Sequence, residues 1–283
     1  MVIRHNCGFC VAHTLHDVYS FIKSLQHRGR EAAGIACIGE TIDVIKWSGG
    51  VARFSITDLY KIFPSEKYHT YLAHVRYATR GRKDRILHDA HPQVIGGTVE
   101  NKGEHTLILD CDAVMVHNGQ VDEKYISEVR KERLSTDCDT EALLQIYFDK
   151  GGKYLLSKIP GSYTLAAVKK GGDVAVMRDQ SGIKPGVLGW KDGKYIAASE
   201  DIALLKNGGA YIEDLSPGHA YYLKPNGSYV KRRVIQENKR HCFFEWNYIA
   251  NLDSTIDSVT VRRVRERLGE ELAKEYPLKV DYV

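Results

Sequence analysis

The sequence predicts an α+β protein in which antiparallel sheets are covered by helices. After Gly161 the chain consists almost wholly of short apolar segments separated by glycine-containing turns, which predicts strands. The pairs Asp192-Gly193 and Asn226-Gly227 lie between such segments and predict tight hairpins. Helical patterns occur in blocks that are kept apart from these strands, so the class is α+β.

The N-terminal part contains one predicted helix followed by strands. Over residues 16–27 the apolar residues recur at i, i+3, i+4 and i+7, which is one face of a helix. Residues 33–38 form a continuous apolar run that predicts a buried strand, and 41–47 alternate as its hairpin partner. Further strands are predicted over 71–77, 105–109 and 113–117, and the last two are joined by a turn at Asp110-Cys111-Asp112.

Two helices and a strand-rich half follow. Helical patterns cover 122–134 and 139–149, with Asp122 and Asp139 as N-caps. A short helix over 201–206 ends at Gly208-Gly209. Near the C-terminus, 259–276 predicts a charged helix ended by Pro277, and 278–283 begins a β-like run. The remaining strands are predicted over 162–168, 174–178, 187–190, 195–198, 220–223 and 229–234.

Composition excludes several classes of protein. The 283 residues carry 40 Lys plus Arg and 36 Asp plus Glu, and this net charge of +4 is too small to indicate nucleic-acid binding. No window approaches 18 apolar residues without charge, so no membrane span is predicted, and the first residues do not form a secretory signal. The six cysteines suggest no disulfide ladder and predict reduced thiols in the cytoplasm. The Cys7–Cys10 pair has C-x-x-C spacing but no second such pair, so no metal site is predicted.

Several short motifs are weak singly but specific in their order. They are Cys7-Gly8, His27-Arg28-Gly29, His74-Val75-Arg76-Tyr77-Ala78-Thr79, His117-Asn118-Gly119, Asp137-Cys138-Asp139-Thr140-Glu141 and the segment from Cys242 to Ser254. In this order the chain resembles the class II glutamine amidotransferase domain, an N-terminal-nucleophile hydrolase, and most closely that of the amidophosphoribosyltransferase family. The resemblance implies a four-layer αββα sandwich with two antiparallel sheets, followed by a C-terminal linker helix.

The resemblance also implies an enzyme that hydrolyses glutamine to glutamate and ammonia. Cys7 matches the family's nucleophile, and a thiolate is intrinsically suited to attack an amide. The family's base is the α-amine of that cysteine, which titrates near 7.7–8.0 in model peptides. Asn118 and Gly119 match the oxyanion hole, where the glycine lets the backbone approach the reacting carbon closely.

The glutamine backbone requires one cation and one anion as binding partners. Arg76 matches the family's carboxylate-binding arginine, and Thr79 can donate a further hydrogen bond. Asp139 matches the carboxylate that receives the ammonium, and Arg28 and Gly29 match the pair that lines the nucleophile's pocket. His74 and His117 are expected to be strand residues satisfied by their neighbours.

The resemblance divides the chain into three parts. Residues 1–6 are expected to be a propeptide, 7–240 the glutaminase domain, and 241–283 a linker with the start of a phosphoribosyltransferase-like domain. The acidic PRPP-binding run of that domain does not occur in the sequence. Mg²⁺ with PRPP would therefore belong to the missing phosphoribosyltransferase domain, and no cofactor is predicted within these residues. Cys242 matches a cluster-ligating position of some members, but one thiolate is too few for an iron–sulfur cluster. The expected partners are glutamine, a phosphoribosyltransferase domain or subunit, and further copies of the chain; neither nucleic acid nor membrane is expected.

Other functions remain open at this level. The chain could be a non-catalytic or regulatory glutamine-binding module, because six residues precede Cys7 and removal of Met1 alone would not free its amine. It could also be a stand-alone glutaminase that serves another acceptor. A different class II amidotransferase is disfavoured by the Cys242–Ser254 segment.

Overall fold

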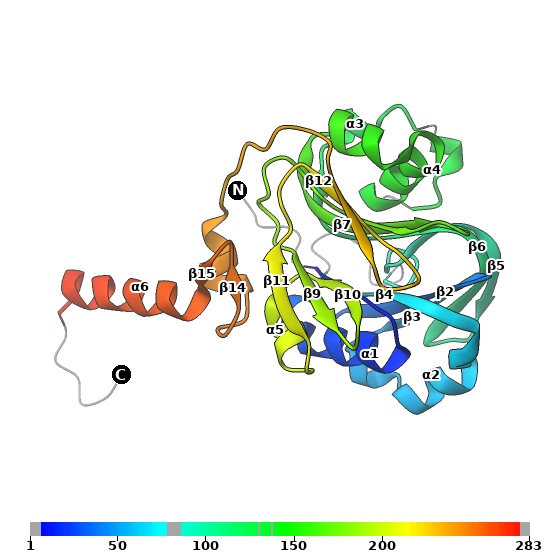
Figure 1. Ribbon diagram of the computed structural model, residues 1–283, viewed down its shortest axis with the longest axis horizontal. Helices are drawn as coiled ribbons and strands as arrows, with labels where there is room; N and C mark the ends of the chain where they lie inside the picture. Colours follow the sequence, from blue (N-terminus) through cyan, green and yellow to red (C-terminus); the bar gives the residue numbers. More distant parts are fainter. Residues whose placement is uncertain (1–6, 78–85, 130, 137, 278–283) are drawn as a thin grey trace.

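The computed structural model describes residues 7–77, 86–129, 131–136 and 138–277. Figure 1 shows four layers, with two layers of strands enclosed between helices α1, α2 and α5 on one side and α3 and α4 on the other. The predicted αββα sandwich is therefore confirmed. In the described part of the chain, no helix is long and apolar enough to cross a membrane.

The first strand layer lies against α1, α2 and α5. Its strands are antiparallel, and β1 is central, between β10 and β4. In hydrogen-bonded order they are β11 (Ala210–Asp214), β9 (Val187–Lys191), β10 (Lys194–Ala198), β1 (Gly8–Ala12), β4 (Tyr68–Arg76), β2 (Ala32–Gly39) and β3 (Ile42–Ser48).

The second strand layer lies against α4 and is joined to the first. The start of β6 pairs with β3, from Val44 opposite Ile108 to Trp47 opposite His105, so the hydrogen-bonded ladder continues from one layer into the other. The antiparallel strands in this layer are β5 (Gln93–Asn101), β6 (His105–Val121), β7 (Gly161–Lys169), β8 (Val174–Arg178), β12 (His219–Leu223) and β13 (Tyr229–Arg233).

Apolar side chains fill all three spaces between the four layers. In β2, Ile35 and Cys37 pack with helix α1, whereas Ala36 and Ile38 face the second strand layer. Because successive side chains of a strand point to opposite faces, a strand buried on both faces must be apolar throughout. This explains the uninterrupted run that predicted β2. The third cluster joins α4 to the outer face of β6, β7 and β8.

The helices begin at recognisable caps. Thr14 caps α1 (Leu15–Ser24) by accepting the Asp17 backbone N–H at 3.0 Å, and Ser55 caps α2 (Ile56–Ile62) in the same way. Asp122 caps α3 (Glu123–Ile126), as predicted. The other two helices of these layers are α4 (Asp139–Lys158) and α5 (Asp201–Leu205).

Some elements differ from the prediction. The predicted turn at 110–112 is wrong, because β6 runs through it as one strand with Asp110 in the left-handed region at φ 58°. The helix predicted over 122–134 is reduced to α3 and a 3₁₀ turn at Lys131–Arg133. Asp139 is the first residue of α4 and Cys138 occupies the N-cap position. Strands β5 and β11 and helix α2 were not predicted.

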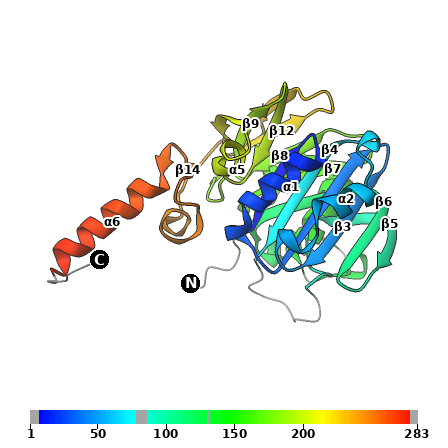
Figure 2. The ribbon, with the colours of Figure 1, turned by 90° about the horizontal axis from the view of Figure 1, so that it is seen from below.

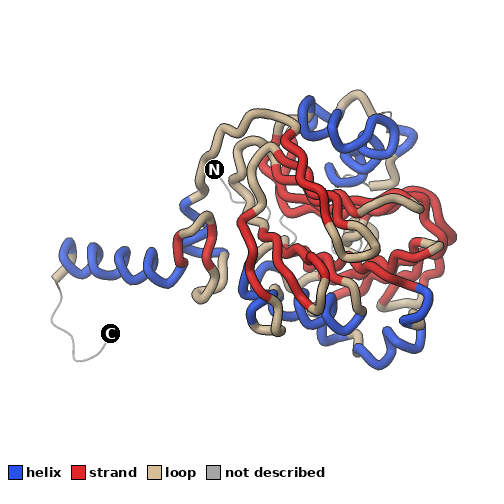
Figure 3. The backbone as a smooth tube through the Cα atoms, in the orientation of Figure 1, coloured by secondary structure: helices blue, strands red, loops and turns tan. Residues whose placement is uncertain are grey.

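The C-terminal segment first packs against the four layers and then extends away from them as a helix. A π-helical turn (Glu245–Ile249) and the hairpin β14 (Thr255–Ile256) and β15 (Val259–Thr260) precede α6 (Val261–Glu275). Figure 2 shows α6 extending away from the four layers, which agrees with the helix predicted over 259–276. In the tube view of Figure 3, a long loop leads from the strands to this segment. The β-like run predicted over 278–283 lies outside the described residues.

Candidate active site

Cys7 lies immediately before β1, in the middle of the first strand layer. Gly8 pairs with Val75, which places Cys7 beside the end of β4 that carries Arg76. The side chain is buried, and burial raises the pKa of the Cys7 thiol, whereas the Tyr77 backbone N–H and the charges of Arg76, Lys184 and Arg28 oppose that rise. Three cations thus favour the thiolate form of Cys7, but burial outweighs them and leaves the pKa of the thiol raised.

Arg28 supports the backbone of Cys7 from a 3₁₀ turn (Gln26–Arg28) that follows α1. Its Nε donates to the Cys7 carbonyl oxygen at 2.9 Å, and its side chain is fully buried. Its two terminal nitrogens pair with Glu200 at 2.5 Å and Glu245 at 3.0 Å. Burial alone would lower the pKa of Arg28, but these carboxylates raise it above its ordinary value. The guanidinium is thus a fixed cation beneath the nucleophile.

Gly29 is required by the close approach of β4. A Cβ at this position would lie 2.5 Å from the Arg76 carbonyl carbon. Arg76 itself is nearly buried, and its guanidinium contacts Asp89 at 3.5 Å and the Ile86 carbonyl oxygen at 3.4 Å. Both contacts are long, and a guanidinium has five N–H donors, so Arg76 can receive a carboxylate in bidentate geometry. Thr79 lies outside the described residues.

Asn118 and Gly119 lie near the end of β6, in the second strand layer. The Asn118 side chain is 0% exposed, and neither Oδ1 nor Nδ2 has a hydrogen-bond partner among the described residues. A Cβ at Gly119 would lie 2.2 Å from the Ser162 carbonyl oxygen, so only glycine allows β7 to lie this close. Because buried polar groups are nearly always paired, an unpaired buried amide next to a glycine backbone indicates a binding position for a polar ligand atom.

Asp139 lies at the N-terminal end of α4 and faces the end of β6. Its Oδ2 accepts the Val121 backbone N–H at 2.9 Å, and its Oδ1 lies 3.7 Å from His117 Nδ1. The side chain remains 19% exposed. A carboxylate held in this way can accept hydrogen bonds from an ammonium group.

Histidines connect the two strand layers between these residues. His74 Nε2 lies 3.1 Å from the His117 carbonyl oxygen and 3.0 Å from His91 Nδ1, and His117 Nδ1 lies 2.9 Å from Thr140 Oγ1. His74 and His117 are thus strand residues with neighbouring partners, as predicted, although one ring nitrogen of each has no partner in the described part of the chain. Burial lowers the pKa of all three histidines, and that of His74 to about 3. They are therefore neutral near pH 7.

Several site residues were not identified from the sequence. Glu245 lies within the Cys242–Ser254 motif, but the sequence assigned no role to it or to Glu200. A charged residue inside an apolar run, as in Phe243-Phe244-Glu245-Trp246, was the signal available. Among the described residues, no group of three or more His, Cys, Asp or Glu side chains is placed to hold a metal ion.

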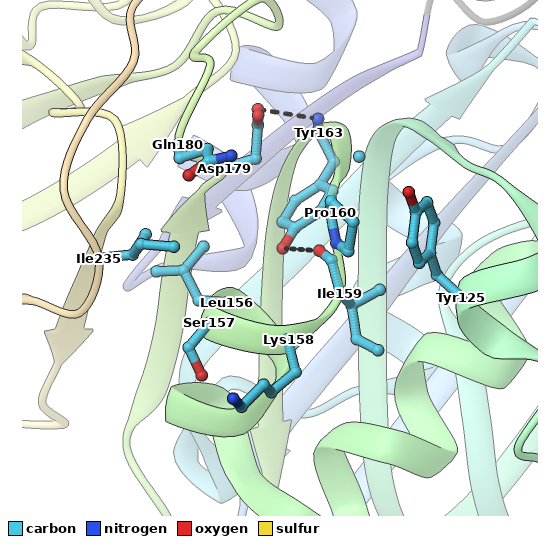
Figure 4. Close-up of a pocket in the computed structure, with 11 residues that line it drawn as sticks. Tyr125, Leu156, Ser157, Lys158, Ile159, Pro160, Tyr163, Asp179, Gln180 and Ile235 are labelled. Atoms are coloured by element: carbon cyan, nitrogen blue, oxygen red, sulfur yellow. Dashed lines mark hydrogen bonds between the residues drawn. The ribbon is translucent and has the colours of Figure 1, made fainter.

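A separate cavity of about 260 Å³ lies at the C-terminal end of α4 (Figure 4). Tyr163, the register partner of Gly119, lines it and donates its backbone N–H to Asp179 at 3.1 Å. None of the predicted site residues lines this cavity. The candidate site is therefore the buried junction of β1, β4 and β6 and not this cavity.

Comparisons with known proteins agree with this geometry. Residues 95–206 match the family described as "Glutamine amidotransferase domain". The amidophosphoribosyltransferase of Archaeoglobus fulgidus is 31% identical over 94% of this chain, and that of Escherichia coli K12 is 28% identical over 94%. The chain covers 57% and 56% of these two proteins, respectively.

A solved structure extends the comparison to the fold. Glutamine phosphoribosylpyrophosphate amidotransferase from B. subtilis, complexed with ADP and GMP, superposes with a TM-score of 0.77 at 24% identity. The match covers 97% of this chain and 59% of that chain. The chain is thus similar to amidophosphoribosyltransferases over nearly its whole length, and its residues 95–206 match a glutamine amidotransferase domain, which confirms the resemblance and the fold predicted from the sequence.

Proposed function

We propose that the chain is a glutaminase module, which hydrolyses glutamine to glutamate and ammonia through a γ-glutamyl thioester on Cys7. The observation that carries this proposal is the unpaired, fully buried amide of Asn118 beside Gly119. Cys7 lies in the facing strand layer, and the His74–His117 contact joins the two layers there. A nucleophile in one strand layer and an unpaired amide donor in the next are two of the groups that acyl transfer requires.

The proposed reaction has two halves. The Cys7 thiol gives its proton to the α-amine of Cys7, and the sulfur attacks the amide carbon of glutamine and forms the C–S bond. The amide oxygen gains the charge that the Asn118 amide and the Gly119 N–H stabilise. The amide nitrogen takes a proton from the α-ammonium of Cys7 and leaves as ammonia. Water then attacks the thioester carbon and gives its proton to the α-amine, and the C–S bond breaks to release glutamate and restore the thiol.

Substrate binding is assigned to the charges at the rim. Arg76 would hold the α-carboxylate of glutamine together with Thr79, and Asp139 would hold the α-ammonium. Arg28 and Gly29 would shape the wall next to Cys7. Two opposite charges on separate elements can select a zwitterionic amino acid over a simple amide.

The domain division belongs to the same proposal. Residues 1–6 would be removed so that Cys7 gains a free α-amine, 7–240 would form the glutaminase domain, and 241–283 would lead into a phosphoribosyltransferase-like domain. In the described part of the chain, no hydrogen bond joins the Cys7 thiol to a histidine, which supports the α-amine as the base. Mass spectrometry of the purified protein should find Cys7 as the first residue.

The ammonia would serve phosphoribosylamine synthesis from PRPP in purine biosynthesis. The names of the relatives support this acceptor, which a phosphoribosyltransferase domain or subunit would bind. We expect the module to act in the cytosol, since all six cysteines are free thiols, and to form homo-oligomers.

The decisive experiment measures glutamate released from glutamine by the chain beginning at Cys7, with Cys7→Ala as the matched control. Hydroxylamine added during turnover should trap the thioester as γ-glutamyl hydroxamate. Glutamine binding without glutamate release by the wild type would instead favour a non-catalytic binding module. Hydrolysis that persists in the Cys7→Ala variant would refute the role of Cys7.

A further inference from the structure

Four buried charged side chains form a compact group beneath Cys7, and we call them the Arg28 cluster. It consists of two cations, Arg28 and Lys184, and two carboxylates, Glu200 and Glu245. Glu245 lies 3.0 Å from the Arg28 guanidinium and 3.4 Å from Lys184 Nζ. Glu200 and Glu245 are 0% exposed, so the ion pairs are largely removed from water.

Glu245 comes from the C-terminal segment, 217 residues along the chain from Arg28. It is the first residue of the π-helical turn, and the same segment is tied to Glu200 in two further places. The Asn251 backbone N–H donates to Glu200 at 2.9 Å, and Ser254 Oγ donates to it at 2.5 Å. The segment 241–256 therefore closes the cluster from a side that the proposed catalytic residues do not reach.

We propose that Glu245 is a positioning residue for the nucleophile, and that segment 241–256 thereby completes the glutaminase site. This inference rests on the proposed function of Cys7. Glu245 and Glu200 bind the two ends of the Arg28 fork, which leaves Nε directed at the Cys7 carbonyl oxygen at 2.9 Å. The orientation of Arg28 thus determines where the backbone of Cys7 lies relative to Asn118.

Stability alone does not account for such a cluster. A buried ion pair stabilises a fold little better than apolar side chains of the same size, because both charges lose their hydration. What the cluster adds is direction, since a planar guanidinium held by two carboxylates has one orientation. The two carboxylates also balance the charges of Arg28 and Lys184, both of which favour the Cys7 thiolate.

The test is Glu245→Gln in the chain beginning at Cys7, with Asp253→Asn as the matched control. Asp253 lies in the same segment and makes an exposed ion pair with Arg262. For Glu245→Gln we expect kcat for glutamine hydrolysis to fall about 100-fold with little change in KM, because a displaced nucleophile loses reactivity and not substrate affinity. Asp253→Asn should leave both unchanged.

Alkylation of Cys7 gives a second readout that does not depend on glutamine. The positive charges around the thiol are those of Arg28, Arg76 and Lys184. Glu245 pairs with Arg28 and Lys184 and partly neutralises these two charges. Its removal should shift the pH midpoint of Cys7 alkylation by iodoacetamide, followed on the Cys7 peptide, to lower pH. Faster alkylation at low pH together with slower turnover is the expected signature.

The outcomes separate positioning from a merely structural role. A lower Tm with unchanged kcat per folded molecule and an unchanged alkylation profile would overturn the proposal. In an Arg28→Met background, Glu245→Gln should lower kcat almost no further. Losses of kcat that are fully additive in the double variant would also overturn the proposal. If Glu245→Gln does not fold, Glu245→Asp, which keeps the charge but shortens the reach, is measured in the same way for the loss of kcat. A wild type without glutaminase activity would refute the proposed function, whereas the alkylation profile would still decide the role of Glu245.

Discussion

Asn118→Leu should make the protein more stable and catalytically inactive at the same time. Leucine has the same number of side-chain heavy atoms as asparagine but needs no hydrogen bonds. The Asn118 amide is fully buried and both of its polar atoms lack partners. A buried polar group without a partner costs about 1–3 kcal/mol, so removing it should raise the free energy of unfolding by about that amount.

The magnitude can be measured by thermal unfolding. For domains of 150–250 residues, 1 kcal/mol corresponds to a change of about 2–4 °C in Tm. Asn207→Leu is the matched control, because Asn207 Nδ2 donates to the Ala203 carbonyl oxygen at 2.7 Å and to Ser24 Oγ at 3.0 Å. The control should lose stability, whereas Asn118→Leu should gain it.

Activity is measured on the same two proteins. Loss of one oxyanion-hole donor lowers kcat by about 10²–10³-fold in other enzymes, and we expect at least this for Asn118→Leu. Asn207→Leu should retain the kcat of the wild type. The reasoning is refuted if Asn118→Leu loses as much stability as the control, or if it hydrolyses glutamine at the wild-type rate.

Three further predictions concern the remaining site residues. Cys7→Ser should bind glutamine almost normally without hydrolysing it. Arg76→Leu should weaken glutamine binding by about 2–5 kcal/mol, because the α-carboxylate of glutamine loses its charged partner. Calorimetric titration of the two variants with glutamine distinguishes these outcomes. Asp139→Asn should raise the KM for glutamine and leave Tm nearly unchanged, since an asparagine oxygen still accepts the Val121 N–H; an unchanged KM in steady-state assays would remove Asp139 from the binding site. Burial alone would raise the pKa of Glu200, but Arg28 and His27 lower it from 4.5 to about 2. This shift corresponds to about 3 kcal/mol of folding stability. That stability is present above pH 4.5 and is lost as the pH falls toward 2. Urea unfolding of Glu200→Gln should therefore depend less on pH between 4.5 and 2 than that of the wild type, and parallel curves would contradict the assignment.

The strands that were predicted correctly are those whose burial follows from their own residues. β2 is buried on both faces, and β7 and β8 are likewise buried runs joined by a glycine-containing turn. β5 was missed because most of it is exposed and it contains Gly96 and Gly97 with positive φ at a register shift. Such glycines indicate a turn in sequence, although here they form a bulge within a strand.

The error in β6 has a tertiary cause. Asp110 adopts the left-handed conformation that normally marks a turn, but its backbone N–H donates to Asp43 Oδ1 at 2.7 Å. That contact joins residues 67 positions apart, so it holds the strand through a bend that local preferences would turn back. No pattern within residues 105–121 contains this information.

The candidate site divides in the same way. The ordered short motifs carried a family resemblance, and that resemblance proposed Cys7, Arg76, Asn118 and Asp139 as a nucleophile, a cation, an amide and a carboxylate. Glu245 was not recognisable, since its function depends on Arg28, which is distant in sequence. Residues that act through another side chain become visible only when the fold brings the two together.

The two glycines of the motifs join packing to chemistry. A Cβ at position 29 would lie 2.5 Å from the carbonyl carbon of Arg76 at the end of β4. A Cβ at position 119 would lie 2.2 Å from the carbonyl oxygen of Ser162 on β7. A methyl group at either position would displace the strand that carries a proposed site residue, because the obstructing atoms are backbone atoms that cannot rotate away. The same absence of a side chain therefore fixes the spacing of the strands. At Gly119 it would also leave the backbone N–H open to the proposed oxyanion, so at this position the packing role does not compete with the proposed catalytic role and makes it possible.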